Sequence, residues 1–355
     1  MNFRYEHPFI IAGPCGAESR EQTLATCRAL AATGMVHAFR GGVWKPRTSP
    51  SSFQGAGDVA LEWLVEASRE TGLPFGVEVA SAGHVVMASK HGAGFVWIGA
   101  RTTVNPFMVQ EIAGAVGQTG IAVLIKNPVT PDVDLWDGAV ERMLGAAVEE
   151  SKIGLIHRGF SMAGHGSYRN PPMWHLALEM RRRRPQMAML CDPSHIAGRR
   201  ELVADISQKA ADLGYDGLMV ESHVEPAAAL SDAGQQFTPP DLAVLLGNIK
   251  WRTGDTDDPA FADALLRCRA EIDRLDAELL GLLSHRMNIS EQIGVIKKEN
   301  NVTILQEKRW SEITHSVLSQ AEALNLSPEF LRALLEAIHL ESINRQNKVM
   351  NEADK

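Results

Sequence analysis

The chain has 355 residues, of which 45% are hydrophobic and 22% charged, a composition typical of a folded globular protein. Its 43 acidic and 35 basic side chains give a net charge of −8, which argues against a general nucleic-acid-binding protein. The sequence has no run of about 18 apolar residues, so it predicts no membrane span. The first residues lack the pattern of a secretory signal. The 4 cysteines are scattered and form no Cys-x-x-Cys pair, so we expect a reduced cytoplasmic protein.

Short apolar runs alternate with amphipathic stretches from residue 8 to about residue 250, as expected of parallel strands buried on both faces. The predicted strands are 9–13, 36–40, 75–79, 95–99, 121–126, 153–157, 187–191 and 217–221. Predicted helices between them include 18–32, 58–70, 132–151 and 198–213. Eight such units favour an α/β fold, a closed (β/α)8 TIM barrel. A doubly wound open sheet is the alternative, but no Gly-x-Gly-x-x-Gly follows the first strand.

The sequence pattern changes after Trp251. Residues 254–260 form a short polar linker, so we expect a barrel domain over 1–253 and an all-helical domain over 261–355. Hydrophobic residues then recur in steps of four and three, which predicts a helix of roughly 35 residues. This hydrophobic stripe consists of Cys268, Ile272, Leu275, Leu279, Leu282, Ile289, Ile293 and Ile296. Two more helices are predicted, at about 305–323 and about 328–348, and three such helices rarely close a core alone, so we expect a homodimer.

Side chains able to bind a metal follow three of the predicted strands. Cys15 follows the first strand, His195 the seventh and Glu221 ends the eighth, with Asp232 in the loop beyond. Barrel closure makes these strands neighbours, and catalytic residues of such barrels lie at the carboxyl ends of the strands. Sulfur, nitrogen and oxygen together suit a divalent transition metal such as Mn, Fe, Co, Zn or Cu. A packed cysteine beside a Glu–His ion pair is the alternative interpretation.

Six cations are predicted at the same mouth of the barrel. They are Arg40, Lys45, Arg47, Arg101, Lys126 and Arg158. Gathered together they would repel one another unless an anion binds between them. Arginine matches phosphate and carboxylate oxygens with two hydrogen bonds, so we expect a small anionic substrate. Solvated loop charges are the alternative, but three of these cations end apolar strands.

Several motifs of the predicted barrel together form a recognisable set. They are GPCGAES (13–19), RGGVWKPRTSPSSFQG (40–55), WIGAR (97–101), HRG (157–159), DPSH (192–195), ESH (221–223) and SDAGQQ (231–236). The set resembles the 3-deoxy-D-arabino-heptulosonate 7-phosphate (DAHP) synthases, of the barrel subtype I-beta. The resemblance implies condensation of phosphoenolpyruvate with erythrose 4-phosphate, the first step of the shikimate pathway to the aromatic amino acids. Condensation with another sugar phosphate is the alternative for the barrel.

The resemblance also implies roles for the residues at the mouth. The phosphate and carboxylate of phosphoenolpyruvate would be held by Arg40, Lys45, Arg101, Lys126 and Arg158. Erythrose phosphate would be held by Arg47, Thr48 and Ser49. The metal, with Mn²⁺ favoured over Fe, Co and Zn, would be bound by Cys15, His195, Glu221 and Asp232, and would polarise the aldehyde. Lys45 is also a candidate catalytic residue for proton transfer, a role that the sequence leaves open.

Polar residues occupy positions in the helical domain where hydrophobic ones are expected. Arg286 interrupts the hydrophobic stripe, and Lys297 lies eleven residues, about three turns, further along the same face. On the last predicted helix, the hydrophobic positions continue into Ser342 and Gln346. A buried arginine requires an anionic partner, either a structural glutamate or a ligand. We expect a small polar pocket inside a helical bundle.

The helical domain carries RAEIDRLDAELLGLLSHRM (269–287), IGVIKKEN (293–300), QEKRW (306–310) and IHLESINRQ (338–346). These motifs resemble the all-helical chorismate mutases of the AroQ class, which implies rearrangement of chorismate to prephenate without a cofactor. The implied chorismate-binding residues are Arg269, Arg286, Lys297, Arg309, Ser342 and Gln346, with Lys297 and Gln346 the candidate catalytic groups. Trp310 departs from the family, which often has an acidic residue there.

Arg269 lies seventeen residues before Arg286, about 25 Å along one helix, so one small ligand cannot contact both from the same chain. We therefore expect Arg269 to complete the site of the partner subunit in an intertwined homodimer; whether dimers pair into tetramers is open. The alternative is a dimerisation and effector-binding module with little mutase activity. Only eight residues precede the first strand. We therefore expect no N-terminal regulatory domain, and prephenate feedback through the helical domain instead.

Overall fold

The computed structural model describes residues 3, 8–45, 51–162, 167–254 and 258–351. It divides into two units, Met1–Gly254 and Asp255–Lys355. Residues 255–257 of the predicted linker, and the three predicted erythrose-phosphate residues Arg47, Thr48 and Ser49, lie outside the described residues. No helix in the described part of the chain combines the length and apolar character needed to cross a bilayer.

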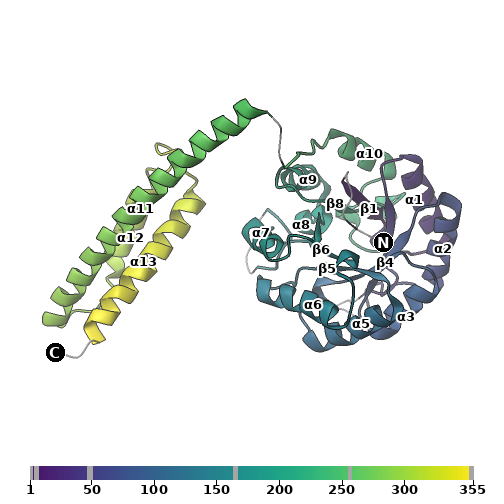
Figure 1. The fold of residues 1–355 in the computed structure, drawn as a ribbon, viewed down its shortest axis with the longest axis horizontal. Coiled ribbons are helices and arrows are strands. Elements are labelled where there is room, and N and C mark those ends of the chain that lie inside the picture. The colour runs from purple at the N-terminus through teal and green to yellow at the C-terminus, as the bar shows by residue number, and fades with distance from the viewer. Residues whose placement is uncertain (1–2, 4–7, 46–50, 163–166, 255–257, 352–355) are drawn as a thin grey trace. The chain divides into compact units, whose positions relative to one another are not determined.

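In the described part of the first unit, eight parallel strands close into a barrel (Figure 1). They are β1 (Phe9–Gly13), β2 (Ala38–Gly41), β3 (Phe75–Val79), β4 (Phe95–Ile98), β5 (Ala122–Lys126), β6 (Ile153–His157), β7 (Ala188–Cys191) and β8 (Gly217–Glu221). Each strand pairs with the next, and β8 pairs with β1 over their whole lengths. This confirms the predicted (β/α)8 barrel, and the alternative of an open sheet is wrong.

Helices surround the barrel (Figure 1). They are α1 (Arg20–Ala32), α2 (Val59–Thr71), α3 (Ala82–Lys90), α4 (Ala100–Thr103), α5 (Pro106–Thr119), α6 (Val133–Gly145), α7 (Trp174–Arg183), α8 (Pro193–Ala197), α9 (Val203–Asp212) and α10 (Pro239–Asn248). Short 3-10 turns are η1 (Glu150–Lys152), η2 (Arg200–Leu202), η3 (Pro226–Ala228) and η4 (Ala233–Gln235). The prediction of one helix over 198–213 is wrong at its start, because Gly198, with φ 71°, closes α8 and η2 precedes α9.

Side chains inside the barrel alternate with side chains that face the helices. The inner cluster is apolar and includes Ala38, Leu124, Ile156, Leu190 and Met219. Because the side-chain period of a strand is two, the next inward position lies at the mouth. In the same order, these mouth positions are Arg40, Lys126, Arg158, Asp192 and Glu221. The interior of the barrel is therefore filled with apolar side chains, and charged side chains line it at the carboxyl ends of the strands.

The second unit consists of α11 (Pro259–Glu299), α12 (Glu307–Leu318) and α13 (Pro328–Asn351). Helix α13 packs along α11, and Gly294 allows a close approach there, since a Cβ at this position would lie 3.1 Å from Gln346 Cα. The α11 positions buried against α13 are Met287, Ser290 and Gly294. Helix α11 has 41 residues against the roughly 35 predicted, and it begins within the predicted linker. Helices α12 and α13 begin within two residues of their predicted starts, and α12 ends five residues early.

The hydrophobic stripe of α11 is not the buried face that its periodicity predicts. Ile272, Leu279 and Ile289 are 55%, 51% and 44% exposed, and Arg286 is also exposed. The reason is geometric, because α13 covers the neighbouring face of α11 that carries Met287 and Gly294. The expectation of a buried Arg286 is therefore wrong for the single chain, and the stripe is left uncovered by the described residues.

His157, the last residue of β6, faces the helices and lies among aromatic side chains. Its Nε2 lies 2.6 Å from the carbonyl oxygen of Pro172, and its Nδ1 lies 2.9 Å from the hydroxyl of Tyr215. The ring of Trp174 meets it edge-on at 5.1 Å. Burial lowers the pKa of His157 to about 4, so the folded barrel keeps this ring neutral at pH values where an exposed histidine is charged.

We predict that His157 makes the barrel less stable as the pH falls from about 6.5 to about 4, because in this range the unfolded chain takes up a proton that the folded chain does not. The full loss is about 3 kcal/mol. Urea unfolding followed by tryptophan fluorescence should show a weaker pH dependence in His157→Gln than in the wild type. The exposed His175 gives the control, His175→Gln. Equal pH dependence in His157→Gln and the wild type would contradict the assignment.

Candidate metal centre and substrate pockets

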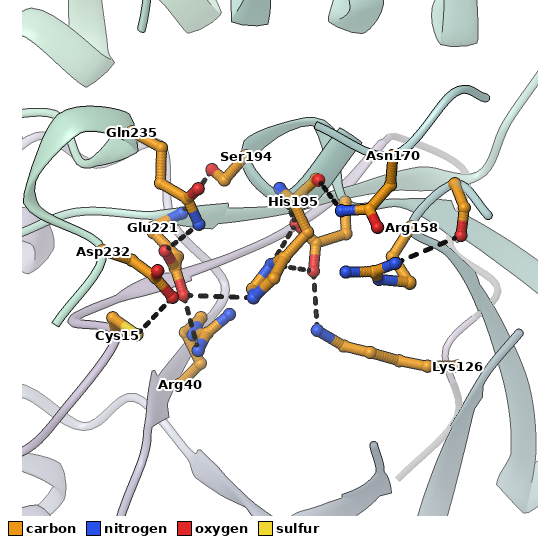
Figure 2. A network of polar contacts seen from close by, with 12 residues as sticks. Cys15, Arg40, Lys126, Arg158, Asn170, Ser194, His195, Glu221, Asp232 and Gln235 are labelled. Carbon is orange, nitrogen blue, oxygen red and sulfur yellow. Dashed lines mark hydrogen bonds and ion pairs between the residues drawn. The ribbon is translucent and has the colours of Figure 1, made fainter. Parts of the chain in front are cut away.

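A cavity of about 330 Å³ opens at the carboxyl ends of the barrel strands. Five of the six predicted cations line it, namely Arg40, Lys45, Arg101, Lys126 and Arg158. Three of the four predicted metal ligands line it too, namely Cys15, His195 and Asp232. The fourth, Glu221, is fully buried and lies beside them (Figure 2). The structure thus brings both predicted groups together around one cavity.

The predicted metal ligands form a compact set. Cys15 Sγ and one carboxylate oxygen each of Glu221 and Asp232 lie within 4.8 Å of one another. Cys15 Sγ is 3.3 Å from Asp232 Oδ2, and His195 Nε2 is 3.7 Å from Glu221 Oε1. Asp192 holds the other ring nitrogen of His195, with 2.8 Å between His195 Nδ1 and Asp192 Oδ2. The imidazole therefore presents Nε2 toward the carboxylates (Figure 2).

These residues fit a divalent cation. Glu221 Oε1 is buried and accepts no hydrogen bond from the described residues, and Arg40 Nη2 lies 3.1 Å from it as an ion-pair partner. A metal bound at this oxygen would share it with that guanidinium. A histidine held through one nitrogen by a carboxylate is a usual arrangement for a metal ligand. Burial raises the pKa of the Cys15 thiol to about 12, and the charge of Glu221 adds to this. A bound cation would favour the thiolate instead.

The two buried carboxylates at the mouth are held ionised by their neighbours. Burial alone would raise the pKa of Glu221, but His195 and Arg40 outweigh burial and lower it. Burial likewise acts to raise the pKa of Asp192, yet His195 and Lys126 hold it well below its usual range. Both carboxylates are therefore available as charged acceptors.

Two of the predicted anion-binding cations are paired with these carboxylates. Arg40, 2% exposed, lies 3.1 Å from Glu221 Oε1 and over the ring of Trp97. Lys126 Nζ lies 2.6 Å from Asp192 Oδ2. Glu221 and Asp192 thus neutralise part of the positive charge for which the sequence pattern predicts an anionic substrate. Arg40 nevertheless retains Nε and Nη1 without a hydrogen-bond partner in the described residues.

Positive charge is only partly compensated around Arg158, where the charge of Asp192 opposes the effect of burial on its pKa without outweighing it. Burial lowers the pKa of this guanidinium to about 10, and the nearby charges of Arg169 and Arg101 act in the same direction. No carboxylate among the described residues forms an ion pair with Arg158. A buried arginine that is crowded by other cations is a binding site for an anion, since an anion would relieve both the desolvation and the repulsion.

Sequence reasoning missed three polar residues of this site. Asp192 anchors both Lys126 and His195, and the alternation of inward positions in β7 gives the signal that finds it. Gln235 and Arg169 contact the carboxylates of Glu221 and Asp232 from outside the cluster. Both lie in loops, where no periodicity indicates the direction of a side chain.

The helical unit brings four of its six predicted chorismate residues to the facing sides of α11 and α13. Arg286 Nη1 donates to Ser342 Oγ at 2.5 Å. Gln346 is buried, and its Oε1 has no hydrogen-bond partner in the described residues. Gly294, one turn before Lys297, lies against Gln346. An unpartnered buried amide oxygen, one turn beyond the serine that Arg286 contacts, favours a site for a polar ligand.

An aromatic pair borders this site. The rings of Trp310 and His339 stack at 4.0 Å. Burial lowers the pKa of His339, and Arg286 and Lys297 lower it further, which places both cations near its ring. The remaining two predicted residues, Arg269 and Arg309, are exposed, and in the described part of the chain they form no hydrogen bond or ion pair with the other four.

Known proteins resemble both units. Residues 5–255 match the DAHP synthetase I family, and residues 268–347 match chorismate mutase type II. Phospho-2-dehydro-3-deoxyheptonate aldolase of Thermotoga maritima is 34% identical over 228 residues, which are 64% of this chain and 64% of that protein. 2-Dehydro-3-deoxyphosphooctonate aldolase of Variovorax paradoxus is 29% identical over 248 residues, 63% of this chain and 82% of that protein.

Solved structures give the same result. The crystal structure of DAHP synthase from Thermotoga maritima has a TM-score of 0.62 at 32% identity, covering 73% of this chain and 70% of that one. A truncated form of that synthase has a TM-score of 0.59 at 28% identity, covering 73% of this chain and 88% of that one. The chain therefore belongs to the DAHP synthetase I family, with a chorismate mutase type II domain at residues 268–347.

Proposed function

We propose that the chain is a bifunctional enzyme. The barrel condenses phosphoenolpyruvate with erythrose 4-phosphate to DAHP and phosphate, and the helical domain rearranges chorismate to prephenate. For the barrel, the observation that carries the proposal is the cavity in which buried cations adjoin the Cys15, Glu221 and Asp232 cluster. For the helical domain it is the unpartnered buried oxygen of Gln346, on the same helix as Ser342, to which Arg286 donates.

In the barrel, the cations bind and orient phosphoenolpyruvate. Arg158 and Arg101 contact its phosphate, and the free nitrogens of Arg40 contact its carboxylate, so C3 of phosphoenolpyruvate is directed at the aldehyde carbon of the second substrate. A divalent metal, held by Cys15, His195, Glu221 and Asp232, supplies a Lewis acid for that aldehyde. Water then adds at C2, and phosphate leaves. The surrounding cations stabilise the charge that develops.

Lys45 is the proposed proton donor of the synthase. Its ammonium lies 2.9 Å from Cys15 Sγ and also donates to the Cys15 carbonyl oxygen, so it adjoins a proposed metal ligand in the wall of the cavity. From there it would donate a proton to the aldehyde oxygen, which needs one as the carbon–carbon bond forms. Arg47, Thr48 and Ser49 remain the proposed contacts of the erythrose phosphate.

In the helical domain, catalysis consists of binding chorismate and stabilising the charge that develops in the transition state. Arg286 and Arg309 hold the carboxylates of chorismate, and Ser342 fixes Arg286. Lys297 and Gln346 then stabilise charge on the ether oxygen as the bond breaks. The exposed hydrophobic stripe of α11 supports a homodimer, since Ile272 and Leu279 have no cover in the described residues. In that dimer Arg269 reaches the site of the partner subunit.

We predict that the purified full-length protein, supplied with Mn²⁺, releases phosphate from phosphoenolpyruvate with erythrose 4-phosphate and not with arabinose 5-phosphate. Removal of metal by a chelator should abolish the reaction, because the aldehyde is then no longer polarised. Added Mn²⁺ should restore it. Activity with arabinose 5-phosphate alone would establish the other sugar-phosphate reaction, and full activity after complete metal removal would refute the metal site.

We predict that Arg269→Ala and Arg286→Ala each lower mutase activity by about 100-fold, since each removes a charged contact. When the two variants are unfolded and refolded together, mixed dimers should regain one intact site, and roughly a quarter of the wild-type activity should return. Chorismate absorbance measures both results. Failure to complement would contradict the shared site. No chorismate loss in the wild type, with prephenate still binding, would favour the regulatory module.

We also propose that prephenate inhibits the synthase by binding the helical domain. Synthase initial rates should fall when prephenate is added to the full chain. Arg286→Ala, which removes a proposed prephenate contact, should abolish the inhibition. Synthase rates that stay constant at prephenate concentrations sufficient to inhibit the mutase would exclude this feedback.

A further inference from the structure

Two side chains outside the four proposed ligands connect two of those ligands. Arg169 Nη1 donates to Asp232 Oδ1 at 2.9 Å and to Gln235 Oε1 at 3.1 Å. Gln235 Nε2 donates to Glu221 Oε2 at 2.7 Å. An unbroken series of hydrogen bonds thus joins the two carboxylates through an arginine and an amide. We call Arg169 and Gln235 the carboxylate bridge.

The carboxylate bridge uses only one oxygen of each carboxylate. The other oxygens face inward, where Asp232 Oδ2 lies 3.3 Å from Cys15 Sγ. Glu221 Oε1 lies 3.7 Å from His195 Nε2 and 3.1 Å from Arg40 Nη2, with which it forms an ion pair. Figure 2 shows Gln235 on the outer side of Glu221, away from Cys15. The bridge therefore holds the outer oxygens and leaves the inner pair directed at Cys15, His195 and Arg40, where a bound divalent cation would share Glu221 Oε1 with the Arg40 guanidinium.

The amide of Gln235 suits this bridge. Between a guanidinium and a carboxylate, its oxygen accepts from the first while its nitrogen donates to the second. Gln235 is 1% exposed, so its orientation is fixed by these two bonds. The backbone couples it to Asp232, because Asp232 is the N-cap of η4, Gln235 is the last residue of η4, and Gln235 N donates to the Asp232 carbonyl oxygen at 3.2 Å.

The backbone of Asp232 is itself constrained. Its φ of 50° lies in the left-handed region, which few residues other than glycine adopt and which aspartate tolerates. Strained backbone persists where surrounding contacts determine it. Here the ion pair with Arg169 and the bond to Gln235 supply such contacts.

We propose that Arg169 and Gln235 are positioning residues for the metal, which fix Glu221 and Asp232 in the orientation that binds a divalent cation. The proposal rests on the proposed function, since it assumes a metal on Cys15, His195, Glu221 and Asp232. Outer residues of this kind restrict the ligands before the metal arrives, and their loss usually weakens metal binding by about 10–100-fold.

Titration calorimetry of the metal-free, full-length protein with Mn²⁺ tests the proposal. Arg169→Ala and Gln235→Leu should each weaken Mn²⁺ binding by about 10–100-fold, and Arg169→Lys, which retains one donor, by less. Arg20→Ala is the matched control for a half-exposed arginine, since Arg20 pairs with Glu66 on the outer helices. Gln208→Leu is the matched control for a bridging amide, since Gln208 joins Asp212 to the Lys250 carbonyl oxygen. Both controls should bind Mn²⁺ as the wild type does.

Co²⁺ absorption provides a second readout that does not depend on activity. At saturating Co²⁺, both bridge variants should retain the thiolate-to-cobalt band but show altered visible bands, because the carboxylates have reoriented. Mn²⁺ affinities within twofold of the wild type, with unchanged Co²⁺ spectra, would overturn the proposal. Absence of Mn²⁺ binding in the wild type would instead refute the proposed metal site. If Gln235→Leu fails to fold, the half-exposed Arg169 variants decide the question.

Discussion

Parallel pairing of β8 with β1 is the constraint on which the barrel site depends. It sets Gly13 opposite Glu221 and thereby brings Cys15 next to Asp232, 217 positions away in the sequence. In an open sheet β1 and β8 would not pair, and Cys15 would lie far from Glu221 and Asp232. Closure also removes the exposed edges of β1 and β8. One set of backbone hydrogen bonds thus completes the fold and assembles the candidate metal ligands.

The charges at the mouth are balanced by pairs between alternate strands of the barrel, with one strand between the two partners. Arg40 faces Glu221, and Lys126 faces Asp192, all within the apolar wall of the barrel. Removing one member of such a buried pair leaves the other uncompensated, at a cost of about 3–5 kcal/mol. These side chains therefore contribute to the stability of the folded barrel as well as to the chemistry of the site. Arg158 is different, because it is buried with no carboxylate partner among the described residues, and this is why we assign its charge to a ligand.

Sequence patterns predict the parts of this structure that repeat. The strands are found because each is a short apolar run, and the mouth residues are found because they end those runs. Arg169 and Gln235 are not found, since their loops have no period that fixes where a side chain points. The stripe on α11 shows a different limit. Periodicity identifies Leu279 and Ile289 as an apolar face, but it cannot say whether the covering surface belongs to the same chain.

Because the stripe on α11 is uncovered in the single chain, the stability of the helical unit depends on protein concentration. In the proposed dimer, folding of the helical unit and association of two chains are one equilibrium, so dilution destabilises the helices and concentration stabilises them. The barrel has its own closed core and does not share this dependence. The chain thus combines two units. The stability of the barrel does not depend on concentration, whereas the stability of the helical unit follows mass action.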